Sequence, residues 1–200
     1  MTWTQLFELG DLTLTLPLAS AMAAGLLGAR DWRAAAAWSA LFVLALALVG
    51  AAKLAFLGWG TGLPALDFKA PSGHAAGVSV VFPTLFYLLL RDGRERLRRA
   101  GVVCGLVLGA LVAGLLVLAG EHSPAEAWAG WLIGSAASLA AVRLMGPRPA
   151  PRPWAGLACA LVAFAGVAWM MQRAQVGYWM IKVAMALSGN ARPFSWDSCS

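Results

Sequence analysis

The chain has 200 residues, of which 60% are hydrophobic and only 12% are charged. A water-soluble domain of this length could not bury so many apolar side chains, so the composition indicates one membrane-embedded domain. The formal net charge is +6, but most of the basic residues are arginines gathered between long apolar runs. That distribution reflects membrane topology, and no nucleic-acid partner is expected.

Six apolar stretches are long enough to cross, or nearly cross, a bilayer. They cover about residues 12–29, 34–57, 73–90, 101–120, 126–144 and 154–172. Because the hydrocarbon core offers no water to backbone groups, each stretch is predicted to be a helix. The predicted fold class is therefore all-α, a polytopic membrane bundle of about six transmembrane helices.

The chain divides into a membrane-embedded helical domain, residues 1–173, and an interfacial segment with a tail, residues 174–200. Within the second part, residues 174–187 contain Tyr178, Trp179 and Lys182 among apolar neighbours. That pattern favours a short interfacial helix.

Arginines collect in alternate loops, which predicts the orientation of the bundle. Ten of the fifteen basic residues follow the first, third and fifth stretches, namely Arg30, Arg33, Arg91, Arg94, Arg96, Arg98, Arg99, Arg143, Arg148 and Arg152. The positive-inside rule makes these loops cytoplasmic. The 58–72 and 121–125 loops then face the periplasm of a bacterial-type inner membrane.

Both histidines of the chain, His74 and His122, lie in short polar islands on that predicted outer face. In the first island Ser72 can cap the following helix, and Gly73 permits close approach of a ligand to the backbone. The first turn of that helix favours an anion, and His74 there could protonate a leaving oxygen. The simpler alternative is a helix cap followed by a histidine at the membrane interface.

The second island has the pattern of a capping box, with Ser123 at the cap and Glu126 three residues later. Glu126 also lies four residues from His122, so one carboxylate oxygen could cap the helix while the other orients the imidazole. A zinc site made by both histidines with Glu121 and Glu126 is a weaker alternative, because no His-x-x-x-His spacing is present. We therefore expect no metal or other cofactor.

These islands carry a family resemblance. Pro71-Ser72-Gly73-His74, followed by His122-Ser123-Pro124-Ala125-Glu126 and Ala127-Trp128-Ala129-Gly130-Trp131, resembles the type-2 phosphatidic acid phosphatase family, which shares its core with the vanadium-dependent haloperoxidases. The motifs of that family are Lys, six residues, Arg-Pro; then Pro-Ser-Gly-His; then Ser-Arg, five residues, His, three residues, Asp. The resemblance spans about residues 10 to 145, with the second motif complete and the third partial.

The resemblance implies a phosphohistidine mechanism. It makes His122 the nucleophile, Glu126 the carboxylate that activates it, and His74 the general acid for the leaving group. It also implies a set of phosphate-binding residues: Lys53 at the first-motif lysine, Ser72, and the backbone of Gly73. Lys69, just before the second motif, is the best local substitute for the two motif arginines that this chain lacks.

Two departures concern the phosphate-clamping arginines. Gly60-Thr61 stands where the first motif has Arg-Pro, and Leu115-Leu116 stands where the third has Ser-Arg. Because arginine forks grip phosphate through two hydrogen bonds, their loss should weaken transition-state stabilisation by several kcal/mol. Three other basic residues on the same predicted face are candidate substitutes: Arg173, Lys182 and Arg192.

The leading hypothesis is an integral membrane phosphatase that hydrolyses a lipid-linked phosphate or a prenyl diphosphate at the periplasmic face. One alternative is a catalytically degenerate subunit that binds lipid or assists assembly in an envelope-lipid pathway. Another is a phosphotransferase that hands the phosphate to a second lipid. Membrane lipids are the surroundings in every case, and the sequence leaves the protein partners unknown.

Overall fold

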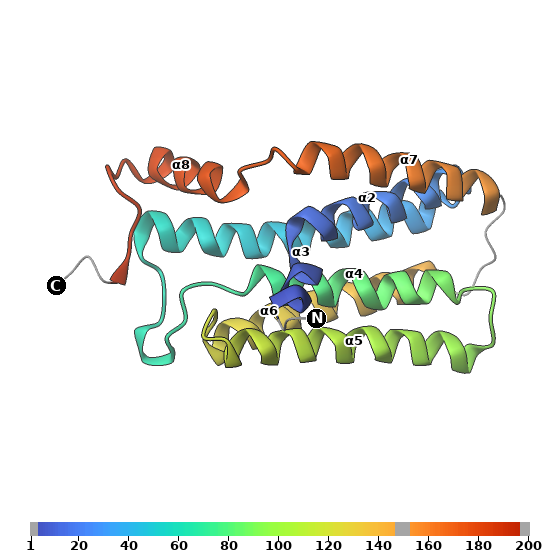
Figure 1. Ribbon diagram of the computed structural model, residues 1–200, viewed down its shortest axis with the longest axis horizontal. Helices are drawn as coiled ribbons and strands as arrows, with labels where there is room; N and C mark the ends of the chain where they lie inside the picture. Colours follow the sequence, from blue (N-terminus) through green and yellow to red (C-terminus); the bar gives the residue numbers. More distant parts are fainter. Residues whose placement is uncertain (1–3, 147–152, 197–200) are drawn as a thin grey trace.

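The chain folds into a bundle of helices (Figure 1), and the computed structural model describes residues 4–146 and 153–196. Most of each predicted apolar stretch lies within one helix. The elements in order are α1 (Thr4–Phe7), η1 (Glu8–Gly10), α2 (Leu12–Gly28), α3 (Trp32–Trp59), η2 (Pro64–Leu66), α4 (Gly73–Leu89), α5 (Glu95–Leu118), α6 (Pro124–Met145), α7 (Pro153–Met171) and α8 (Val176–Ser188). The predicted all-α membrane bundle is confirmed.

Within the described residues, four helices are long and apolar enough to cross a bilayer: α3, α5, α6 and the Trp154–Met171 part of α7. Helices α2 and α4 coincide with two further predicted stretches, but each has 17 residues. A helix of that length spans about 25 Å, which is at the lower limit for a hydrocarbon core of about 30 Å. By length and composition alone, four of the six predicted spans are therefore long enough.

Helix α4 is the centre of the bundle, and buried side chains occur on all of its faces. Its neighbours α5 and α6 approach it through glycines spaced four residues apart, as in small-xxx-small helix pairs. A Cβ on Gly105 of α5 would lie 2.4 Å from the Pro83 nitrogen, and one on Gly134 of α6 would lie 2.4 Å from the Ala76 carbonyl oxygen. The three backbones are therefore in direct contact, and this contact fixes the first turn of α4 against the start of α6.

The two ends of the bundle differ in charge. The α2–α3 and α4–α5 turns lie together at the right of Figure 1, and a buried ion pair between Asp31 and Arg91 joins them. The Gly60–Ser72 loop and the α5–α6 turn lie toward the opposite end of the bundle. Of the arginines assigned to the first end, Arg148 and Arg152 lie outside the described residues.

Helix α8 occupies nearly the segment where a short helix was predicted, and it packs beside α3. Its place at the membrane interface stays a prediction. The residues that follow it, Asn190–Trp196, dock on the end of α3. The Asn190 side-chain amide donates to the Gly58 carbonyl at 2.7 Å, and the Phe194 N–H donates to the Leu57 carbonyl at 2.7 Å. We call this segment the docked tail; its sequence had not predicted any structure.

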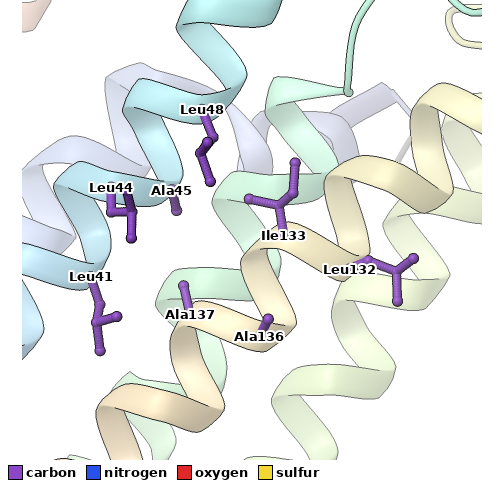
Figure 2. A pocket seen from close by; sticks show the side chains of 8 residues that line it. All are labelled: Leu41, Leu44, Ala45, Leu48, Leu132, Ile133, Ala136 and Ala137. Atoms are coloured by element: carbon purple, nitrogen blue, oxygen red, sulfur yellow. The ribbon is translucent and has the colours of Figure 1, made fainter.

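An apolar groove of about 430 Å³ lies along the seam between α3 and α6 (Figure 2). Leu44, Ala45 and Leu48 of α3 line one side, and Ile133 and Ala137 of α6 line the other. The small alanine side chains leave the groove open, and no polar side chain lines it. Such a surface suits contact with hydrocarbon.

Candidate active site

The site begins with the pair formed by His122 and Glu126 at the start of α6. The His122 Nδ1 atom lies 2.8 Å from the Glu126 Oε2 atom, and the carboxylate is buried. A carboxylate acceptor at Nδ1 keeps the ring proton there, so the Nε2 atom carries the free lone pair. The arrangement suits an imidazole that acts as a nucleophile or a base.

The same carboxylate also fastens the loop that leads to α4. Its Oε1 atom accepts from the Lys69 N–H at 2.8 Å and from the Ala70 N–H at 3.4 Å. Its Oε2 atom completes the capping box by accepting from the Ser123 N–H at 3.4 Å, besides pairing with His122. The prediction that one carboxylate oxygen caps the helix while the other orients the ring is therefore wrong. Oε2 makes both contacts, and Oε1 accepts from the loop.

The first turn of α4 carries the other half of the site. Ser72 is fully buried, and its Oγ atom accepts from the Ala75 N–H at 3.3 Å as the helix cap. Among the hydrogen bonds of the described residues, none uses the N–H groups of Gly73 and His74. The Lys53 Nζ atom would lie 3.5 Å from a Cβ placed on Gly73, so an ammonium group lies beside the two N–H groups that the cap leaves free.

Two cavities divide the site residues between them. Lys53, Gly73 and His74 line a cavity of about 610 Å³, whereas His122 and Lys69 line a second cavity of about 340 Å³. Charge interactions connect the two, since His74 lies within electrostatic range of both Lys53 and His122. Lys53 in turn interacts with the Glu126 carboxylate. The histidines are thus neighbours whose rings line different openings.

Glu121 is exposed and lines the smaller cavity beside His122. It does not join the two histidines in a metal centre. Within the described part of the chain, no three His, Cys, Asp or Glu side chains lie close enough together to hold a metal ion.

Gly60 and Leu116 stand at the two positions of the missing arginines, and both pack against neighbouring side chains. Gly60 ends α3 in a left-handed conformation, and a Cβ there would lie 2.8 Å from the ring of Phe194 in the docked tail. Leu116 is buried in an apolar cluster with side chains of α4, α5 and α6. An arginine could not occupy either place without rearranging these neighbours.

The proposed substitute cations stand apart from the histidines. The Arg173 guanidinium lies 5.7 Å from the Trp169 ring centre, and the Lys182 ammonium lies 5.2 Å from that of Tyr178. Arg192 is exposed, and none of the three lines either cavity. Among the described residues, Lys53 and Lys69 are the basic side chains that line the two cavities.

Sequence reasoning missed one charged neighbour of the histidines, Asp11. Its Oδ2 atom lies 3.6 Å from the His74 Nε2 atom. No local pattern signals this contact, because the two residues belong to different helices. The sequence showed only that Asp11 precedes an apolar stretch, as a helix cap would.

Comparison with known proteins agrees with the site. Residues 58–150 match the PAP2 superfamily, and this segment contains both histidines and Glu126. The chain is also 37% identical, over 164 residues, to an uncharacterised 22.5 kDa protein in the cps region of Klebsiella pneumoniae, covering 80% of this chain and 78% of that protein. No solved structure matches it. The chain belongs to the PAP2 superfamily, and this membership suggests phosphatase-type activity.

Proposed function

We propose that the protein is a membrane phosphatase that hydrolyses a lipid-linked phosphate or diphosphate through a phosphohistidine at His122. The observation that carries the proposal is the position of the Lys53 ammonium beside the free N–H groups of Gly73 and His74 in the first turn of α4, within electrostatic range of the Glu126 carboxylate. Free helix N–H groups together with a cation form a site for a phosphate group. A phosphate held there would lie in the cavity that His74 lines, and the proposal requires His122 to reach it from the neighbouring cavity.

The chemistry follows from the two imidazoles. The His122 Nε2 atom attacks phosphorus, the bond from phosphorus to the leaving oxygen breaks, and protonated His74 gives its proton to that oxygen. In the second step water attacks phosphorus, the phosphorus–nitrogen bond breaks, and neutral His74 takes a proton from the water. Glu126 stabilises the positive charge that His122 carries in the intermediate.

The apolar groove supports a substrate with a hydrocarbon chain. Helices α3 and α6, which line the groove, also carry Lys53 and Glu126. Leu48 lies five residues before Lys53, which is about 7.5 Å along the helix axis, and Leu132 lies six residues after Glu126, about 9 Å. These distances, measured along the helix axes, are short enough for a hydrocarbon chain attached to a phosphate at the site to reach the groove.

Phosphate release by the purified protein in lipid nanodiscs tests the proposal, with phosphatidic acid and a prenyl diphosphate as substrates. We expect turnover that His122→Ala abolishes, and a base-stable, acid-labile phosphoenzyme when ³²P-labelled substrate is mixed and quenched. Glu121→Gln is the matched control, because it removes a charge next to His122 and should retain activity. Undiminished turnover by His122→Ala would refute the mechanism.

Loss of the arginines favours a second candidate, a lipid-binding relative without turnover. Phe194 packs against Gly60, and Leu116 is buried, so both arginine positions of the family are filled by apolar contacts. This candidate predicts saturable binding of lipid phosphate to the same nanodiscs with no phosphate release. The phosphoenzyme measurement separates it from the phosphatase.

A further inference from the structure

The N-terminal segment packs directly against the site helix. A Cβ on Gly10 would lie 2.4 Å from the His74 carbonyl oxygen, and one on Gly77 would lie 2.9 Å from the Gly10 carbonyl oxygen. Only glycine allows so close an approach at these two positions, because any side chain would overlap backbone atoms. The contact brings the turn between η1 and α2 to the first turn of α4.

Asp11, which follows Gly10, presents its carboxylate in two directions. Its Oδ1 atom accepts from the Thr13 N–H at 2.7 Å and caps α2. Its Oδ2 atom lies 3.6 Å from the His74 Nε2 atom, in the cavity that Lys53 also lines. Partial burial works against the charge, but hydrogen bonds from Thr13 and the neighbouring His74 hold the pKa of Asp11 below its ordinary value.

The charges around His74 show how the Asp11 contact affects the protonation of the ring. Lys53 of α3 places a positive charge within range of the ring, and His122 before α6 is a second electrostatic neighbour. Among the described residues that interact electrostatically with His74, Asp11 is the anion. Without Asp11, the partly buried His74 ring faces the Lys53 ammonium with no opposing anion, so it loses its proton more readily.

We propose that Asp11 is a positioning residue that favours the protonated form of His74, which is the form able to donate to the leaving oxygen. This proposal rests on the proposed function for its catalytic meaning. Asp11 lies outside residues 58–150, the segment that matches the PAP2 superfamily. The N-terminal segment thus contributes to the site a second carboxylate–histidine pair beside that of Glu126 and His122.

Histidine NMR tests the pairing without any need for activity. The chain has two histidines, so ring-labelled protein in nanodiscs gives two titrating signals, which His122→Ala assigns. Asp11→Asn keeps the helix cap, since asparagine caps as well as aspartate does, and removes the charge. We expect the His74 titration to move to lower pH in Asp11→Asn and to stay in place in Glu8→Gln, which removes an exposed carboxylate from the same segment. An unmoved His74 titration in Asp11→Asn overturns the proposal.

The pH dependence of kcat tests the catalytic role of the Asp11–His74 pair. A proton donor is lost as the pH rises, so Asp11→Asn should shift the alkaline limb of the profile to lower pH and lower kcat a few-fold there. The acid limb should stay in place, and Asp11→Glu should restore part of the alkaline activity. If the NMR signal moves but the wild-type protein shows no turnover, the pairing stands and the proposed function fails. If turnover depends on His122 while the alkaline limb stays in place, the positioning role fails.

Discussion

At the scale of single residues, the proposed site has one lysine and the backbone of a helix in place of arginine forks. A lysine ammonium is a compact point charge, whereas a guanidinium binds two phosphate oxygens at fixed geometry. In the proposed function Lys53 would therefore supply charge without orientation, and the N–H groups of Gly73 and His74 would orient the phosphate. Loss of the Lys53 charge should therefore weaken phosphate binding strongly.

Replacement of Lys53 tests its contribution to substrate binding. We expect Lys53→Met to lower kcat/KM about 100-fold, comparable to the loss of one donor at an oxyanion site, with KM raised as well. Lys182→Met is the control, because that ammonium lies over the Tyr178 ring away from the cavities. Equal activity of the two variants in a phosphate-release assay would show that Lys53 does not bind the substrate.

The two carboxylate–histidine pairs show how far the sequence predicts such a site. His122 and Glu126 are four residues apart at a helix start, so helix geometry alone brings them together. Asp11 and His74 are far apart along the chain, and their contact depends on how α2 packs against α4. Local spacing therefore predicted the first pair, and only the tertiary structure reveals the second.

At the scale of helices, glycines set the position of α4. The sequence predicts that α4 is a helix from its apolar run, but apolar residues on every side give no indication of which face meets which neighbour. The contacts of Gly105 with Pro83 and of Gly134 with Ala76 supply that information. The lengths of the helices were predictable from composition, and their pairing was not.

Two glycines of α5 provide a matched test of this packing. Gly105→Ala places a Cβ 2.4 Å from the Pro83 nitrogen and should destabilise the protein by about 1–3 kcal/mol. Gly114→Ala places a Cβ in open space on the same helix and should stabilise it by up to about 1 kcal/mol. Thermal unfolding in detergent measures both. A fall in Tm of equal size for the two variants would contradict direct backbone contact.

At the scale of the whole molecule, the bundle separates an arginine-rich end from the end that carries the histidine islands. Arg30, Arg33 and the 91–99 segment lie at one end, joined by the Asp31–Arg91 pair. The Gly60–Ser72 loop lies toward the other. We infer from the positive-inside rule that the arginine-rich end faces the cytoplasm and the site faces the periplasm.

Cysteine labelling in intact cells tests this orientation. In a variant with its three cysteines replaced, Asp67→Cys should react with a membrane-impermeant thiol reagent, whereas Arg94→Cys should react only after the cells are lysed. Both native side chains are exposed, so accessibility in the folded protein is matched. The opposite labelling pattern would place the site on the cytoplasmic face.

The docked tail has a consequence for how the protein is made. Phe194 packs on Gly60, and the Lys69 ammonium lies 5.4 Å from the ring centre of Trp196, so residues beyond α8 cover the loop that leads to the histidines. These residues leave the ribosome after every part of the PAP2 segment. The contacts of Phe194 with Gly60 and of Trp196 with Lys69 therefore form only when α8 has been synthesised and its tail has reached the same side of the membrane as the loop. A nascent chain that stops at α7 would expose an unfinished site, however well its central helices have packed.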